Sequence, residues 1–251
     1  MVPIMWNRHS ALGCVVGLCV VLLAGCGSSP AKTASTAGGG STPSPSSPDT
    51  SRPESSASLS RLKEIVLQAA DLPAGTKGTA RKPDPNTAAS QAEMAKCAGV
   101  RNTDRDKIAE AHSENYALAN TTISSSATSY RSQSDLDTRL ALLRSTKAPS
   151  CFNELLRKQL TTVLPAGTSI ESVSVKITPG PAGGPANVVA TAAGAILVYV
   201  SGQKVPVYAS LAFITGPLIE ARVEVVNIGA PPSASAMTSL VVAVATRAAK
   251  G

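Results

Sequence analysis

Aromatic side chains are scarce in this chain of 251 residues, which has two Phe, four Tyr and one Trp. Stacking platforms for nucleic-acid bases and sugar grooves lined with Trp both need such rings. We therefore expect no nucleic-acid partner and no Trp-lined sugar site. Histidine is equally scarce, because His9 and His112 are the only two. This excludes metal sites and mechanisms that need a histidine pair, and we expect no metal and no cofactor.

Sequence motifs typical of known catalytic sites are also missing. The sequence has no Gly-x-Ser-x-Gly elbow, no Ser-x-x-Lys set complete with Ser-Asp-Asn and Lys-Thr-Gly, no phosphate-binding P-loop and no dinucleotide-binding glycine pattern. His112 is best interpreted as an exposed histidine at the end of a strand, although it could be combined with Ser113 into a triad. The run Ser124-Ser125-Ser126 reads as a polar strand. We therefore predict no catalytic residues.

The N-terminal segment carries the most specific motif of the sequence. An uncharged apolar run of 14 residues, Ala11 to Ala24, is shorter than the roughly 20 residues of a membrane-spanning helix and is typical of a signal peptide. It ends in Leu23-Ala24-Gly25-Cys26, which resembles the lipobox of bacterial lipoproteins. The resemblance implies cleavage before Cys26, a lipid on its thiol and attachment to the outer face of the cell membrane. Ordinary secretory cleavage, with Cys26 incidental, is the alternative.

Composition then divides the rest of the chain. Residues 26–57 are rich in Ser, Thr, Gly, Pro and Ala and lack large apolar side chains, so they cannot bury a core and predict a disordered tether. Residues 58–251 are enough for one globular domain. The expected organisation is a signal peptide over 1–25, a lipidated tether over 26–57 and a single domain over 58–251.

Hydrophobic periodicity predicts helices first, then strands, then a last helix. The expected helices are Leu59–Ala70, Ala88–Ala98, Ser134–Ser145 with Ser134 as its cap, Ser150–Val163 and Ser233–Ala249. The expected strands are Lys107–Ala117, Thr121–Tyr130, Glu171–Ile177, Asn187–Val200, Val205–Thr215 and Leu218–Asn227. This order indicates an α+β domain, with an antiparallel sheet of about five or six strands packed against four or five helices.

The expected strand over 218–227 alternates between apolar and charged residues. Such alternation is typical of a strand with one face on the core and one face in water. The apolar set expected to point inward is Ile219, Ala221, Val223 and Val225. The charged set, Glu220, Arg222 and Glu224, is expected to point outward as a solvated ladder.

Five cysteines sort by position. Cys14 and Cys19 lie in the signal peptide and Cys26 in the lipobox, which leaves Cys97 and Cys151 in the domain. An even pair in an exported protein predicts a disulfide. Two buried free thiols are the alternative.

The segment from Ile123 to Ser132, followed by a Leu-rich helix and Cys151, resembles the sensor domains of mycobacterial receptor kinases of the PknH type and related extracytoplasmic lipoproteins. It departs from that pattern in having Lys147-Ala148-Pro149 where a Trp is usual. The resemblance implies an α+β domain with a ligand-binding cleft, and it carries over no catalytic residue.

Taken together, these features predict a non-enzymatic envelope lipoprotein, held by Cys26, that binds a small apolar or envelope ligand or a protein partner. One alternative is a hydrolase acting on envelope components through an unrecognised site. Another is a structural accessory subunit of an envelope complex.

Overall fold

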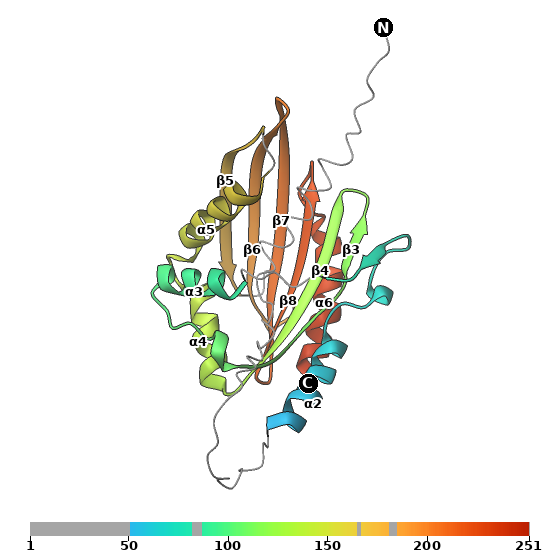
Figure 1. Ribbon diagram of the computed structural model, residues 1–251. Coiled ribbons are helices and arrows are strands. Elements are labelled where there is room, and N and C mark those ends of the chain that lie inside the picture. Colours follow the sequence, from blue (N-terminus) through green and yellow to red (C-terminus); the bar gives the residue numbers. More distant parts are fainter. Residues whose placement is uncertain (1–50, 82–86, 165–166, 181–184, 251) are drawn as a thin grey trace, which may run out of the picture.

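The computed structural model describes residues 51–81, 87–164, 167–180 and 185–250 (Figure 1). The predicted signal peptide, the lipobox with Cys26 and most of the predicted tether lie outside these residues.

The described residues form five α-helices and eight strands, in the α+β class. The helices are α2 (Ser51–Ile65), α3 (Thr87–Ala98), α4 (Gln133–Arg144), α5 (Ala148–Val163) and α6 (Ala234–Lys250). The strands are β1 (Lys77–Thr79), β2 (Lys107–His112), β3 (Asn115–Leu118), β4 (Thr121–Tyr130), β5 (Thr168–Pro179), β6 (Val188–Val200), β7 (Gln203–Gly216) and β8 (Ile219–Ile228).

All eight strands belong to one antiparallel sheet in the order β1-β3-β4-β8-β7-β6-β5, and β2 also pairs with β4. Strand β4 therefore has β8 along one edge, while β2 and β3 share its other edge. Tight turns join β6 to β7 and β7 to β8. The first turn places Ser201 and Gly202 at positive φ, as a two-residue hairpin of type I′ requires.

Helices cover both faces of this sheet (Figure 1). Helices α2 and α6 contact each other and pack on β2, β4, β7 and β8. Helices α4 and α5 pack on the opposite face, and α3 packs on α5. Two separate apolar cores result, one on each face of the sheet.

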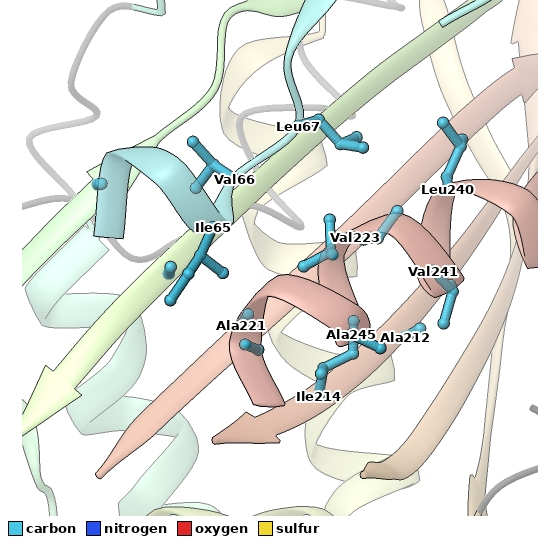
Figure 2. Packing of buried hydrophobic residues seen from close by; sticks show 14 of the residues in the cluster. Ile65, Val66, Leu67, Ala212, Ile214, Ala221, Val223, Leu240, Val241 and Ala245 are labelled. Atoms are coloured by element: carbon cyan, nitrogen blue, oxygen red, sulfur yellow. The ribbon is translucent and has the colours of Figure 1, made fainter. Parts of the chain in front are cut away.

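The core under α6 consists of small and branched side chains. Figure 2 shows Leu240, Val241 and Ala245 of α6 in the same cluster as Ala221 and Val223 of β8. Burying each larger side chain of this kind contributes about 1.5–3 kcal/mol. The helix also approaches the sheet backbone closely, because a Cβ on Gly216 of β7 would lie 2.2 Å from the carbonyl oxygen of Ala248. Glycine is therefore required where α6 crosses the end of β7.

The sequence prediction of an α+β fold is confirmed, but the predicted sheet of five or six strands has fewer strands than the observed sheet of eight. The expected strand over 107–117 is two strands, β2 and β3, and the three-residue β1 was missed. Strand β1 is too short to show periodicity, and β2 and β3 are separated by the pair Ser113 and Glu114. Helix α2 begins at Ser51 and ends at Ile65 instead of spanning Leu59–Ala70.

The cap of α4 also differs from the prediction. The N-cap is Ser132, whose hydroxyl accepts a hydrogen bond from the backbone N–H of Asp135. Ser134 lies inside the helix. Both serines precede an acidic residue three positions on, so the sequence pattern alone could not distinguish the two registers.

Candidate functional site: a buried polar face of the sheet

Strand pairing places a group of polar residues together on the α4 side of the sheet. In the register, Glu110 of β2 lies opposite Thr128 of β4, which lies opposite Glu220 of β8. One row further, the sequence of partners is His112, Ser126 and Arg222, and the next row pairs Ser124 with Glu224. Directly paired residues point to the same side of a sheet. We call the following eight residues the polar face: Glu110, His112, Ser124, Ser126, Thr128, Glu220, Arg222 and Glu224.

The charged residues of β8 are buried, which corrects the expected outward ladder. Glu220 and Arg222 are each 6% exposed and Glu224 is 2% exposed. The reason is the position of β8, which lies in the middle of the sheet between β4 and β7 and has helices on both sides. Alternation correctly separated the two faces of the strand, but neither face is in water.

The buried carboxylate of Glu220 is stabilised by hydrogen bonds and by an opposite charge. Arg139 of α4 donates to it from Nε at 2.9 Å and from Nη2 at 3.3 Å, and the hydroxyl of Tyr130 donates at 3.3 Å. Burial alone would raise the pKa of Glu220, but the charge of Arg139 and its hydrogen bonds outweigh burial and lower it. The carboxylate of Glu220 therefore has a structural role, because it joins β8 to α4 through Arg139.

Glu224 has no hydrogen bonds of this kind. Neither of its carboxyl oxygens has a hydrogen-bond partner, although both are buried. Burial raises its pKa to about 7, against the opposing charges of Arg222 and Arg81. Buried polar groups are hydrogen-bonded in the great majority of cases, so an orphaned carboxyl needs an explanation.

Glu110 and His112 form a second unusual pair. His112 Nε2 lies 3.4 Å from Glu110 Oε1, and the nearest ammonium group, that of Lys107, lies 3.6 Å from Oε2. Neither oxygen of Glu110 makes a hydrogen bond, and His112 Nδ1 is also without a partner. Burial raises the pKa of Glu110 to about 7. Burial, together with the charges of Arg81, Arg222 and Lys107, lowers the pKa of His112 to about 3, so the imidazole is neutral at physiological pH.

His112 is the last residue of β2, as predicted, but it is not the exposed histidine that was expected. The side chain of His112 is 23% exposed and lies beside a carboxyl group that is 2% exposed. Sequence alone gave no reason to combine Glu110 and His112 with residues 222 and 224, because that arrangement depends on β2 and β8 sharing β4 as neighbour.

Three hydroxyl groups of β4 lie between the two orphaned carboxyls in the register. Ser124, Ser126 and Thr128 are all buried, at 1%, 4% and 5% exposure. The run that the sequence indicated as a polar strand is therefore a strand whose polar side faces the interior.

The polar face offers no metal site of the usual kind. Among the residues that the structure describes, no three His, Cys, Asp or Glu side chains are placed to hold a metal ion together.

Over the same residues, no helix is long and apolar enough to cross a membrane.

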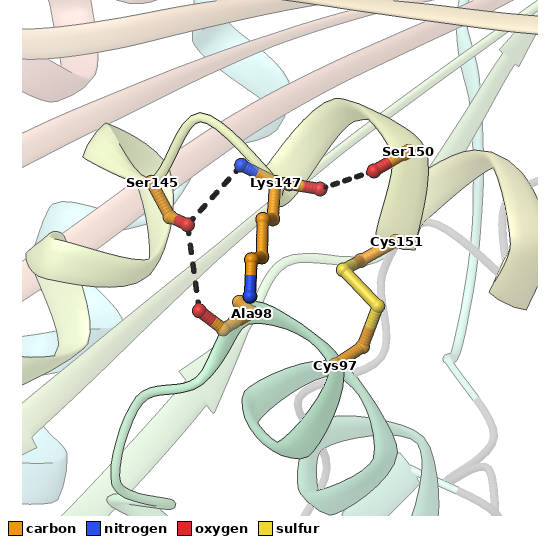
Figure 3. Close-up of a disulfide and its surroundings, with 6 residues drawn as sticks. All are labelled: Cys97, Ala98, Ser145, Lys147, Ser150 and Cys151. Atoms are coloured by element: carbon orange, nitrogen blue, oxygen red, sulfur yellow. Dashed lines mark hydrogen bonds between the residues drawn. A yellow bond between two sulfur atoms is a disulfide. The ribbon is translucent and has the colours of Figure 1, made fainter.

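The predicted disulfide is present and lies outside the polar face. Cys97 of α3 is bonded to Cys151 of α5, with an S–S distance of 2.03 Å (Figure 3). Beside it, the hydroxyl of Ser145 donates to the carbonyl of Ala98 at 3.5 Å. A small pocket of about 70 Å³ borders the disulfide, lined by residues of α3 and α5.

Comparison with known proteins adds no relative. No family model, no curated protein and no solved structure matches this chain.

Proposed function

We propose that this protein is a lipid-anchored envelope protein whose extracytoplasmic domain binds a polar ligand on the polar face. The observation that carries the proposal is Glu224, a carboxyl group that is 2% exposed and has no hydrogen-bond partner. The proposed role is binding rather than catalysis.

The physical basis is the cost of burying charge. Removing a carboxylate from water without compensation costs several kcal/mol, and most folded proteins avoid it. Glu110 and Glu224 carry part of this cost, because the charge of Lys107 near Glu110 and the charges of Arg222 and Arg81 near Glu224 do not outweigh burial. A ligand that donates hydrogen bonds to them recovers part of it on binding, because the partners missing from the protein are then supplied. Ionisable groups with strongly shifted pKa values are also found preferentially at functional sites.

A polar site favours a polar ligand over the apolar ligand that the sequence left open. The described polar face presents carboxyl, hydroxyl, imidazole and guanidinium groups, whereas apolar ligands bind in cavities lined mainly by apolar side chains. The apolar cores on both sides of the sheet are filled by α2, α6, α4 and α5.

Mass spectrometry of the full chain gently extracted from its own membranes tests the binding role. We expect an additional noncovalent mass on the wild-type protein that is lost in Glu224→Leu. Glu171→Leu is the matched control, because Glu171 is an exposed glutamate paired with Lys204 on the far strands. Equal retention of the mass in both variants, or no additional mass at all, contradicts binding at this face.

The anchor is tested separately at Cys26. The lipobox supports a diacylglyceryl group on its thiol, and the two acyl chains of that group give durable membrane attachment. The mass of the N-terminal peptide after digestion should exceed that of an unmodified Cys26 by the lipid, and Cys26→Ala should release the protein from the membrane. An unmodified N-terminal peptide beginning elsewhere contradicts the anchor.

A hydrolase is the second candidate, favoured by one observation. Glu110 lies 3.4 Å from His112, and Ser126 is the cross-strand neighbour of that histidine. Against it, no hydrogen bond joins His112 to a serine among the described residues, and an imidazole with a pKa of about 3 is a weak base. Hydrolysis of envelope esters or glycosides that disappears in His112→Ala, with ligand binding retained, would favour this candidate over pure binding.

A further inference from the structure

We infer that one end of the domain docks against an anionic phospholipid bilayer, with Ile108 and Leu218 inserted among the lipid headgroups and Arg61 at their phosphates. This inference rests on the lipid anchor of the proposed function and adds an orientation of the domain on the membrane. We call the surface involved the docking end. It is the surface around a pocket of about 90 Å³ lined by α2, the start of β2, the end of β4 and the turn between β7 and β8.

Exposed apolar side chains meet at the docking end. Three large apolar residues are exposed in the described part of the chain, Ile108 at 37%, Leu218 at 38% and Val242 at 43%. Ile108 and Leu218 line the same pocket, next to Pro217, whereas Val242 lies on α6 and is not one of its lining residues. Single exposed apolar residues are ordinary on protein surfaces, but neighbouring ones with a polar rim mark interaction sites.

The backbone of Leu218 is a second, independent observation. Leu218 follows Pro217 in the turn between Gly216 of β7 and Ile219 of β8, and its φ is +57°. At such a turn position Gly or Asn is favoured, and a bulky side chain costs free energy of folding. The turn thus carries an exposed leucine that folding does not favour, which supports an intermolecular role for this side chain.

Arginines without ion pairs surround the pocket. Arg61 of α2 is the one charged residue that lines it, and Tyr130, the last residue of β4, lines it as well. The next residue, Arg131, donates from its backbone N–H to the carbonyl of Asp106 at 3.1 Å, which places Arg105 nearby. All three arginines are exposed, and no ion pair between described residues involves them.

The carboxylates of the same segments leave this end positively charged. The three that flank Arg105 and Arg131 in the sequence are Asp104, Asp106 and Asp135. Each of them pairs with Lys107 or Arg101. Five cations therefore face three solvent-accessible carboxylates. A basic surface with apolar side chains at its centre is complementary to anionic lipid headgroups over an apolar interior.

The position of the tether favours a membrane over a diffusing protein as the partner. Residues 26–50 separate the predicted anchor from Ser51, the first residue of α2. A flexible chain of this length and composition has a root-mean-square span of about 25–30 Å. Along α2, Ser51 and the pocket residue Ser58 are about 10 Å apart. The tether therefore holds the docking end close to the bilayer, where two apolar side chains and a few cations suffice because the effective concentration is high.

Tryptophan fluorescence of the full lipidated chain in vesicles tests the docking. In a Trp6→Phe background, which removes the only Trp of the chain, Leu218→Trp introduces a reporter at the turn. Acyl-chain-brominated lipids quench a Trp that enters the bilayer. We expect quenching and a blue shift in vesicles that contain phosphatidylglycerol, and less of both in pure phosphatidylcholine or at high salt. Val242→Trp, the matched control, should not be quenched.

Charge and side-chain variants locate the contact. Arg61→Glu should lower the docking equilibrium about tenfold, and Lys63→Glu, an exposed cation of α2 that does not line the pocket, should change it little. With the reporter at Ile108→Trp, Leu218→Asn should weaken quenching, because the apolar side chain is lost. Its thermal midpoint should be unchanged or higher, since Asn accepts a positive φ. A fall in that midpoint equal to the loss of quenching would assign Leu218 to folding and overturn its role in docking.

The outcomes separate this inference from the proposed function. Equal quenching of Leu218→Trp and Val242→Trp, or no quenching of either on vesicles that retain the lipidated chain, overturns the docking and leaves the anchor standing. A blue shift that grows with protein concentration in detergent, without quenching by brominated lipid, assigns the surface to a protein partner and also overturns it. An unmodified Cys26 in a chain whose turn is still quenched overturns the anchor and supports the docking.

Discussion

Arg247 of α6 donates to both carboxylate oxygens of Asp71, from Nη1 at 3.0 Å and from Nη2 at 2.7 Å. The same guanidinium donates to the backbone carbonyls of Ile65 and Val66, each at 3.2 Å. These carbonyls lie at the C-terminal end of α2, where backbone acceptors lack helical partners. Arg247 thus joins the first described helix to the last one.

Arg247→Met should therefore destabilise the protein by about 2 kcal/mol, because it leaves Asp71 and two carbonyls without their donor. The loss should be measured by urea unfolding at neutral pH. Lys158→Met is the control, since the ion pair of Lys158 with Glu93 is largely exposed and should contribute less than about 1 kcal/mol.

The hydrogen bond from Arg247 lowers the pKa of Asp71 below 3.8. The contribution of the Asp71 carboxylate to stability is therefore present above pH 3.8 and is lost as the pH falls further. An Arg247→Met variant as stable as wild type contradicts this role.

Glu224→Gln should change how stability depends on pH. The pKa of Glu224 rises from 4.5 to about 7 on folding, so the folded state binds a proton that the unfolded state has released between these values. Stability from this group is fully present below pH 4.5 and is lost as the pH rises through 7. Relative to wild type, ligand-free Glu224→Gln should gain about 3 kcal/mol between pH 4 and pH 8. Parallel stability curves for the two proteins would show that Glu224 ionises normally in the folded state.

His112 should remain neutral well into the acid range. Burial lowers its pKa from 6.5 to about 3, so its contribution to stability is present above pH 6.5 and is lost as the pH falls toward 3. Imidazole ¹⁵N chemical shifts of the folded protein should stay those of a neutral ring at pH 5. Protonation with a midpoint near 6.5 would instead indicate an accessible, solvated histidine.

The disulfide should account for a large share of the stability. Cys97 and Cys151 are separated by 54 positions, and closing a loop of this length contributes about 4 kcal/mol in the chain-entropy account. The double variant Cys97→Ser/Cys151→Ser should lose an amount of that order, measured by denaturant unfolding. The same loss should appear in wild type after reduction. Because the bond lies outside the polar face, ligand affinity of the folded variant should be unchanged.

Sequence reasoning was most successful where local pattern and environment agree. The bounds of β4 match the structure, and the apolar stripes of α5 and α6 were identified because amphipathic helices bury one side. The disulfide followed from counting cysteines. The strand and the helices depend on residues close together in the sequence, and the disulfide prediction depended on the expectation of export.

The polar face could not be predicted in the same way, because it depends on which strands are neighbours. Glu220, Arg222 and Glu224 read as an outer face under the rule that charged residues point to water, and the rule fails for a central strand. A signal was nevertheless present. Strands β6 and β7 are apolar on both faces, which indicates the middle of a sheet covered on each side, and β8 follows β7 through a tight turn. The charged side chains of β8, the neighbour of β7, could therefore be expected to lie under helices as well.

The most direct test of the central claim is the electron density beside Glu110 and Glu224 in a crystal structure of the full chain purified from its own membranes. Our account predicts density for a bound polar molecule whose hydrogen-bond donors lie within about 3 Å of both carboxyl groups. Carboxyl groups that are instead hydrogen-bonded to the protein itself, with no molecule between them, would contradict it.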